Sequence, residues 1–257
     1  MSEPVYSQIS VGAGEAAREI AVLQRDGGTP GLFWLSGYRS DMVSTKASAL
    51  DALGAAEGWA VTRFDYSGHG QSGGDFLDGT IGRWLEEAEA VFARTTGPQV
   101  VIGSSMGGWI ALLLARALLR QASKRLKGLV LIAPAVDMTE ELMSKQFSPA
   151  ELLALDTHGK VEQPSAYSDE PYPITRRLIE EGRAHLMFGQ TIETGCPVTI
   201  LQGGADPDVP RAHALRLAEH LLLDPVTFTL IPDGDHRLSR DSDLEVLRQA
   251  VRRAVEG

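Results

Sequence analysis

The stretch GSSMG, residues 103–107, contains a serine in a position where it could act as a nucleophile. Gly103 and Gly107 stand two residues before and two residues after Ser105, which matches the pattern G-x-S-x-G. Ser104 is flanked at the same distances by larger residues and does not fit. Such a serine is presented on a sharp turn between a strand and a helix. Ser105 is therefore the candidate nucleophile, although a serine after a glycine turn is also a common helix N-cap.

A serine hydroxyl needs a general base, and the base needs a carboxylate that orients it. Asp206, in GGADPDVP, and His236, in PDGDHRL, each follow an apolar run that is typical of a strand. In proteins that present a serine on a strand-to-helix turn, the chain order is serine, acid, histidine. We therefore expect Asp206 and His236 to lie beside Ser105 and to complete a catalytic triad.

Other residues could serve as the acid or as the histidine of the triad. Asp208 and Asp137 are alternatives for the acid, the second because it follows the preceding strand. His69, in DYSGHGQSGG, is the rival histidine. It precedes the serine in the chain and belongs to a glycine-rich turn, so a structural role is favoured for it. Asp206 is preferred on its position rather than on its residue type, since loop aspartates are usually turn formers.

Acyl transfer through a serine also needs two backbone N–H groups that hold the oxyanion. One is expected from Met106, the residue after the candidate nucleophile. The other is expected from the loop S-G-Y-R-S that follows the apolar run Leu32–Leu35, where Tyr38 is best placed. No metal ion and no organic cofactor is needed for this chemistry, and we expect neither.

The elements that must position these residues alternate along the chain. Apolar runs typical of strands lie at Leu32–Leu35, Ala60–Phe64, Val100–Gly103, Leu129–Ala133, Val198–Gln202 and Val226–Ile231. Helical patterns lie at Met42–Ala56, Ile81–Thr95, Gly107–Leu119, Arg211–Leu222 and Asp243–Val255. This alternation predicts an α/β fold with a mostly parallel central sheet and helices on both faces. Two earlier runs, around Tyr6–Val11 and Ile20–Gln24, predict an antiparallel hairpin.

One connection is much longer than a crossover helix needs. Residues 136–195 hold short helical patterns, such as Ala150–Leu155 and Ile174–Phe188, separated by prolines. We expect a helical lid inserted after the sixth strand, which leaves residues 1–135 and 196–257 as the core.

The apolar residues of this lid could line an acyl pocket, but most are expected simply to pack its helices onto the core. The candidates for substrate contact are Met143, Phe147, Leu178 and Phe188. The wider apolar set of the lid is Met138, Leu142, Leu152, Leu153, Tyr167, Tyr172, Ile179, Leu186 and Met187.

Composition narrows the possible partners. The 257 residues carry a formal net charge of −10, which disfavours binding to the phosphates of nucleic acids. The single cysteine, Cys196, excludes an internal disulfide framework and a multi-cysteine metal site. No apolar run approaches the roughly 18 residues of a membrane span, and no signal-peptide pattern is present. We expect a cytoplasmic protein with a small-molecule substrate.

Motifs over nearly the whole chain resemble those of the α/β-hydrolase superfamily. They are S-G-Y, R-F-D-Y-S-G-H-G-Q-S, G-S-S-M-G-G-W, C-P-V-T-I-L-Q-G-G-A-D-P-D-V-P and D-G-D-H-R. Within the superfamily, the chain is similar to the branch of mitochondrial palmitoyl-protein thioesterases and acyl-glucuronide esterases. That branch shares a T-x-G-x-W segment, which here is Thr80, Gly82 and Trp84. One departure is Ser36, where many relatives carry a histidine, and it bears on the packing of the loop rather than on the chemistry.

The resemblance implies that Ser105, Asp206 and His236 cleave an acyl ester or acyl thioester through an acyl-enzyme intermediate. Two alternatives remain open. One is a small-ester carboxylesterase of broad specificity, and the other is a non-catalytic homologue that binds a ligand with the same fold.

Overall fold

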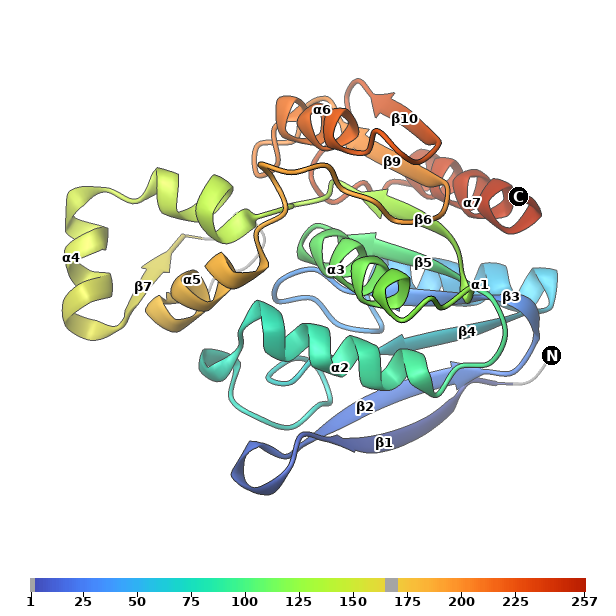
Figure 1. Cartoon of the computed structure of the whole chain (residues 1–257), viewed down its shortest axis with the longest axis horizontal. Helices are drawn as coiled ribbons and strands as arrows, with labels where there is room; N and C mark the ends of the chain where they lie inside the picture. The colour runs from blue at the N-terminus through green and yellow to red at the C-terminus, as the bar shows by residue number, and fades with distance from the viewer. Residues whose placement is uncertain (1–2, 165–170) are drawn as a thin grey trace.

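The computed structural model of the chain describes residues 3–164 and 171–257, and an eight-stranded sheet forms its centre (Figure 1). The strand order is β1-β2-β4-β3-β5-β6-β9-β10. The strands are β1 (Val5–Val11), β2 (Arg18–Arg25), β3 (Gly28–Leu35), β4 (Trp59–Phe64), β5 (Gln99–Ser104), β6 (Leu126–Ile132), β9 (Val198–Gly203) and β10 (Val226–Ile231). Strands β1 and β2 form the predicted antiparallel hairpin, and β2 is antiparallel to β4. All the other neighbours are parallel.

Helices cover both faces of the sheet, as the alternation of patterns predicts. Helices α1 (Thr45–Glu57) and α7 (Asp241–Glu256) pack on one face. Helices α2 (Ile81–Ala93), α3 (Met106–Arg120) and α6 (Arg211–His220) pack on the other. The central strands are buried on both sides, which explains why they consist of continuous apolar runs rather than alternating ones. The predicted fold class is confirmed.

Parallel strands bring the loops that carry the candidate site residues to one edge of the sheet. Tyr38 follows β3, Ser105 follows β5, Asp206 follows β9 and His236 follows β10. Since these four strands run in the same direction, the loops after them lie at the same edge, where ligands bind in open α/β sheets.

Between β6 and β9 the chain leaves the sheet, and we call residues 136–195 the insertion. It extends away from the sheet at the left of Figure 1. Its elements are η3 (Thr139–Met143), η4 (Ser144–Gln146), α4 (Pro149–His158), β7 (Lys160–Gln163), β8 (Tyr172–Thr175), α5 (Arg176–Gly182) and η5 (Arg183–His185). The insertion after β6 is where it was expected, but the antiparallel pair β7–β8 was not predicted. The helix expected over Ile174–Phe188 begins only at Arg176, because Ile174 belongs to β8.

The insertion has a small apolar cluster of its own. Its buried members are Phe147, Leu155, Val161, Ile174 and Ile179. These side chains come from η4's end, α4, β7, β8 and α5, so they hold the five pieces together. Tyr167, one of the apolar residues expected to pack here, lies outside the described residues.

Two carboxylates hold the insertion in place. Asp137, shortly after β6, accepts the backbone N–H groups of Met187 and Phe188, both at 2.8 Å, and so ties the start of the insertion to the segment that follows η5. Glu181 accepts the N–H of Gly82 at 3.1 Å, in the first turn of α2, where a negative charge is favoured by the helix dipole.

Among the described residues, no helix is both long enough and apolar enough to cross a membrane.

Candidate active site

Ser105 lies on a sharp turn between β5 and α3. Its φ of 54° and ψ of −118° are unusual for a residue with a side chain. The flanking glycines are required by close packing: a Cβ on Gly107 would collide with the carbonyl oxygen of Leu35, and one on Gly103 would collide with the carbonyl oxygen of Gly107. The N–H of Ser105 donates to the carbonyl of Ile132 at 2.8 Å, which fixes the turn against β6. The hydroxyl is thereby presented at the edge of the sheet.

His236 and Asp206 lie beside this serine, as the sequence predicts. Nε2 of His236 lies 3.1 Å from Oγ of Ser105. Nδ1 of the same ring lies 2.9 Å from Oδ2 of Asp206. Because an ionised carboxylate only accepts hydrogen bonds, Nδ1 carries the proton and the lone pair of Nε2 faces the serine hydroxyl. Three residues from three loops therefore form one hydrogen-bonded chain.

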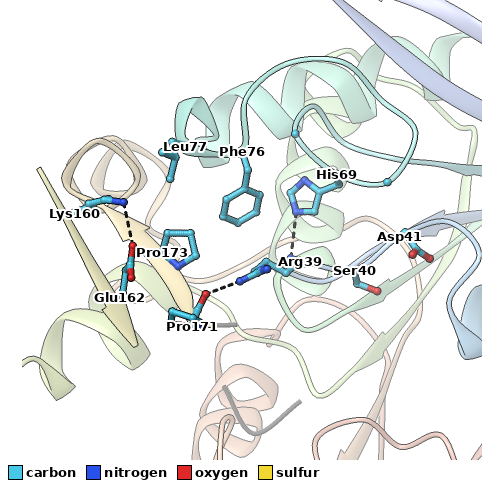
Figure 2. Close-up of a pocket in the computed structure, with 12 residues that line it drawn as sticks. Arg39, Ser40, Asp41, His69, Phe76, Leu77, Lys160, Glu162, Pro171 and Pro173 are labelled. Atoms are coloured by element: carbon cyan, nitrogen blue, oxygen red, sulfur yellow. Dashed lines mark hydrogen bonds and ion pairs between the residues drawn. The ribbon is translucent and has the colours of Figure 1, made fainter. Parts of the chain in front are cut away.

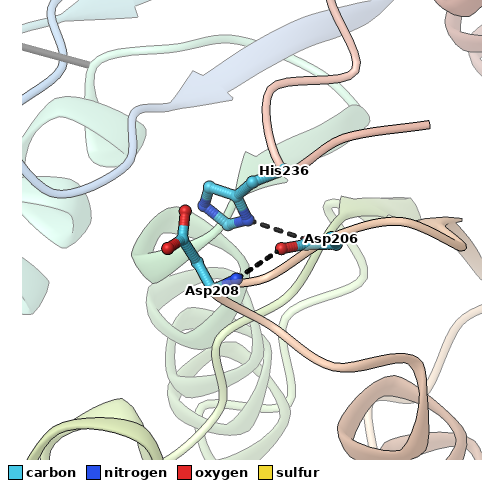
Figure 3. Close-up of side chains that lie close together, drawn as sticks. All are labelled: Asp206, Asp208 and His236. Carbon is cyan, nitrogen blue, oxygen red and sulfur yellow. Dashed lines mark hydrogen bonds and ion pairs between the residues drawn. The ribbon is translucent and has the colours of Figure 1, made fainter. Parts of the chain in front are cut away.

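The Asp206 carboxylate is buried and fully engaged by neighbouring donors (Figure 3). Its Oδ1 accepts the backbone N–H groups of Asp208 and Val209, both at 2.9 Å. Its Oδ2 accepts the proton of His236 and, at 3.3 Å, the side-chain amide of Gln202. Sequence reasoning did not single out Gln202. The signal was available, since Gln202 is a polar residue directly after the apolar pair Ile200–Leu201 of β9 and four residues before Asp206.

The two alternative acids occupy other places. Asp137 binds the backbone of Met187 and Phe188, as described above, and burial raises the pKa of its carboxyl. Asp208 contributes its backbone N–H to Asp206, and its carboxylate lies beside the His236 ring (Figure 3). Asp206, Asp208 and His236 each offer an atom within 4.8 Å of the others, a spacing that a cation could use. The atoms of Asp206 and His236 already serve the hydrogen-bonded chain to Ser105.

The loop after β3 lies against the nucleophile turn. A Cβ on Gly37 would stand 3.4 Å from the Cβ of Ser105, which shows how closely the two loops approach. In the described part of the chain, the backbone N–H groups of Tyr38 and Met106 donate to no protein acceptor. The two donors expected for an oxyanion therefore remain available on loops that flank Ser105.

His69 lies beneath this loop rather than beside the serine. Its Nδ1 lies 3.1 Å from the carbonyl of Ser67, and its Nε2 accepts the backbone N–H of Arg39 at 3.2 Å. Burial lowers the pKa of His69 to about 4, so the ring is neutral and can accept that bond.

Ser36, the departure from the family pattern, accepts the indole N–H of Trp34 at 2.9 Å and donates to the carbonyl of Asp41 at 3.2 Å.

A cavity of about 450 Å³ opens in front of Ser105 and His236. The insertion contributes the apolar residues Met138, Leu142 and Met143, which we call the apolar wall, together with Gln146 and Gln163. The core contributes polar residues that include Lys46, Arg237 and Ser239, which we call the polar wall. The lining of the cavity thus combines apolar and polar groups around Ser105.

Lys46 fastens the loop that carries His236. Its ammonium group donates to the carbonyl oxygen of Arg237 and, at 3.4 Å, to the hydroxyl of Ser239. Burial lowers the pKa of Lys46 to about 8. Sequence reasoning did not find this residue, because nothing in the sequence links position 46 to a loop almost two hundred residues later.

Of the four insertion residues expected to contact substrate, only Met143 lines this cavity. Phe147 packs inside the small cluster of the insertion. Leu178 is 1% exposed and packs into the main core. Phe188 stacks against His213 and His220 and does not line the cavity. These three side chains therefore pack inside the protein, which is the role that the sequence analysis expected for most apolar residues of the insertion.

The chain is similar to known proteins over most of its length. The pattern of the family described as serine aminopeptidase, S33, matches residues 35–177. The chain is 33% identical to the mouse (Mus musculus) mitochondrial palmitoyl-protein thioesterase ABHD10 over 236 residues, which cover 89% of this chain and 76% of that protein. The human (Homo sapiens) protein of the same name is 32% identical over 231 residues, covering 89% of this chain and 74% of that protein.

This chain belongs to the α/β-hydrolase family, in the branch of ABHD10. The solved structure of mouse α/β-hydrolase domain-containing protein 10 has a TM-score of 0.86 and 29% identity, with 97% of this chain and 98% of that chain covered. A solved structure of a protein from Agrobacterium vitis S4 has a TM-score of 0.96 and 49% identity, with 99% and 100% covered. The resemblance noted in the sequence is confirmed, and this α/β-hydrolase is an enzyme of the hydrolase class.

Proposed function

We propose that this α/β-hydrolase cleaves an acyl ester or acyl thioester, with Ser105 as nucleophile, His236 as general base and acid, and Asp206 as the group that orients His236. The observation that carries the proposal is the hydrogen-bonded chain of the three side chains, at 3.1 Å and 2.9 Å. Such a chain removes the proton that makes a serine hydroxyl a poor nucleophile.

The first half of the reaction forms an acyl-enzyme. Nε2 of His236 takes the hydroxyl proton while Oγ of Ser105 attacks the substrate carbonyl carbon. The negative oxygen of the tetrahedral intermediate receives hydrogen bonds from the backbone N–H groups of Tyr38 and Met106. The intermediate then collapses, and the protonated imidazole gives its proton to the departing alcohol or thiol. Asp206 stabilises the positive charge that His236 carries in between.

The second half returns the enzyme to its starting state. His236 takes a proton from a water molecule, and the resulting hydroxide attacks the acyl carbonyl on Ser105. Collapse of the second tetrahedral intermediate releases a carboxylic acid and restores the serine hydroxyl with the proton that His236 held. Every proton in this cycle moves through Nε2, because Nδ1 stays bonded to Asp206.

We further propose that the insertion, residues 136–195, is the lid of the site and that its apolar wall takes the acyl group. Three residues of that wall, Met138, Leu142 and Met143, have flexible apolar side chains that adapt to a hydrocarbon chain. The relatives named palmitoyl-protein thioesterase support a fatty acyl thioester as the substrate class. The polar wall with Lys46 then faces the leaving group. A cytoplasmic location stays a prediction, since those relatives are named as mitochondrial.

A fluorophosphonate probe tests the nucleophile directly, because it reacts only with a serine that a base has activated. We expect the wild type and Ser104→Ala to be labelled, and Ser105→Ala to remain unlabelled. Ser104 is the matched control, since it precedes Ser105 and also lines the cavity. Equal labelling of all three proteins, or of none, would contradict the proposal. A series of p-nitrophenyl esters and acyl thioesters of increasing length then separates a fatty acyl thioesterase from a small-ester carboxylesterase.

A further inference from the structure

The loop that carries the Tyr38 N–H is bonded directly to the insertion. The hydroxyl of Tyr38 donates to the carbonyl oxygen of Pro173 at 2.6 Å. The guanidinium of the next residue, Arg39, donates to the carbonyl oxygen of Pro171 at 2.7 Å. Pro173 belongs to strand β8 and Pro171 directly precedes it, more than 130 positions later in the chain. Two successive side chains of one loop thus hold one short strand.

Tyr38 is enclosed by aromatic rings on several sides. Its ring centroid lies 5.0 Å from that of Phe76, 6.0 Å from that of Trp84 and 6.3 Å from that of Tyr172. Phe76 and Trp84 belong to the core, whereas Tyr172 belongs to β8. Burial raises the pKa of the Tyr38 hydroxyl, so the group stays protonated and acts as a donor. The side chain is therefore clamped between the core and the insertion.

Arg39 sits in a backbone conformation that needs support. Its φ of 56° lies in the left-handed region, which costs about 1–2 kcal/mol for a residue with a side chain. Figure 2 shows what holds it: His69 accepts its backbone N–H, and its guanidinium reaches Pro171. The guanidinium also lies 5.2 Å from the centroid of the Tyr172 ring. The Tyr38–Arg39 peptide, which directly follows the one that carries the Tyr38 N–H, is thus held by His69 of the core, and the side chains on either side of it are held by the insertion.

We propose that the Tyr38 hydroxyl and the Arg39 guanidinium are positioning groups through which β8 of the insertion sets the direction of the Tyr38 N–H and so completes the oxyanion hole. This inference rests on the proposed function, because it assumes that the Tyr38 N–H stabilises an oxyanion. It gives residues 171–173 of the insertion a positioning role for the oxyanion donor, a role that the exposed residues of α5 do not share.

The other fastenings between insertion and core offer a control. Arg177 of α5 pairs with Asp78 at 3.4 Å, and both side chains are exposed. This ion pair joins the insertion to the core but contacts neither Tyr38 nor Arg39 among the described residues. Removing it therefore loosens the insertion without releasing the loop after β3.

Tyr38→Phe is the decisive variant, because it keeps the backbone N–H and the ring and removes only the bond to Pro173. We expect kcat to fall about tenfold, less than the roughly 10²–10³ expected for the loss of a whole oxyanion donor. The Ki of an alkyl trifluoromethyl ketone, whose adduct with Ser105 carries an oxyanion, is expected to rise by the same factor. KM for the same acyl chain stays within about twofold, since the apolar wall is unchanged. Arg177→Ala leaves kcat and Ki at wild-type values.

Arg39→Met provides the second variant and carries the test if Tyr38→Phe does not fold. It removes the bond to Pro171 and is expected to change kcat and Ki together in the same direction. Wild-type kcat and Ki in the folded variants would overturn the inference, as would a fall in melting temperature with no change in Ki. Ser105→Ala, measured alongside, distinguishes a failure of the proposed function from a failure of this inference. If it retains activity, the proposed function fails; if it is inactive while Tyr38→Phe matches wild type, only this inference fails.

Discussion

The edge of the sheet and the insertion are built in different ways. At the edge, Ser105, Asp206 and His236 stand on loops between strands of a sheet whose central residues are almost fully buried. The insertion is held by a cluster of five buried side chains and by two strands of four residues each. From this difference we infer a division of tasks. The large core fixes the positions of the reacting groups, and the small cluster of the insertion shapes the cavity beside them.

Replacing the acid at the edge of the sheet tests the first half of this comparison and has the largest expected effect. Asp206→Asn leaves the shape intact but orients His236 in the wrong tautomer, so kcat is expected to fall by about 10⁴. Asp208→Asn is the matched control, because Asp208 holds Asp206 through its backbone N–H and not through its carboxylate. Steady-state kinetics on one substrate compares the two. A similar loss in both variants would show that the acid was assigned wrongly.

Removing a buried ring from each region tests whether the two cores unfold separately. Phe147→Ala empties part of the insertion's cluster, and Phe92→Ala does the same in the main core. Each truncation typically costs about 3–5 kcal/mol. We expect hydrogen exchange to accelerate only in the insertion for Phe147→Ala and throughout the sheet for Phe92→Ala. Uniform loss of protection in both variants would mean that the molecule is a single cooperative unit.

Met143 tests whether the insertion selects the acyl group. Met143→Ala enlarges the apolar wall of the cavity, and the preferred chain length is expected to shift upward, with kcat/KM for the original chain about tenfold lower. Leu178→Ala, at a buried position outside the cavity, should lower stability without moving that optimum. The measurement is kcat/KM across a series of acyl chain lengths. An unchanged optimum in Met143→Ala would remove the insertion from substrate selection.

His69 gives the smallest expected effect and concerns the support of the loop after β3. Its pKa is about 4 in the folded protein, below the ordinary value of 6.5. Between these two values the unfolded chain binds a proton that the folded protein does not. The free energy of unfolding therefore falls as the pH drops from 6.5 to 4. His69→Gln should show a shallower fall, measured by urea denaturation, and the same slope as wild type between pH 7 and 8. Identical slopes in the acid range would show that His69 is not held neutral.

The same contrast explains what the sequence could predict. The main strands are apolar runs separated by helical patterns, so their succession along the chain and their mostly parallel packing follow from the sequence, whereas their order within the sheet was not predicted. The GSSMG stretch predicts its own turn, because only glycine fits at positions 103 and 107. The positions of Asp206 and His236 could be predicted because each follows an apolar run that is recognisable as a strand. Their roles stay proposals, but the structure does bring both beside Ser105.

The insertion could not be predicted to the same depth. Strand β7 reads KVEQ and has one apolar residue, and β8 reads YPIT and has a proline, so neither shows the alternation of a strand. They pair because the surrounding cluster buries Val161 and Ile174. The links from Lys46 to the loop of His236, and from Tyr38 to Pro173, join distant parts of the chain. No local pattern encodes such links.

Asp137 closes the insertion at its base, since it binds the backbone of residues 187 and 188 with its two carboxylate oxygens. Residues 137 and 187–188 therefore meet at one point, near the end of β6, so that the chain between them leaves and returns at the same place. A segment attached in this way can be lengthened, shortened or exchanged for a foreign one while the register of the sheet is preserved. The part of the molecule that lines the acyl site can therefore be exchanged as one contiguous block, and the inferred role of Tyr38 and Arg39 requires that the new block again offers them carbonyl groups.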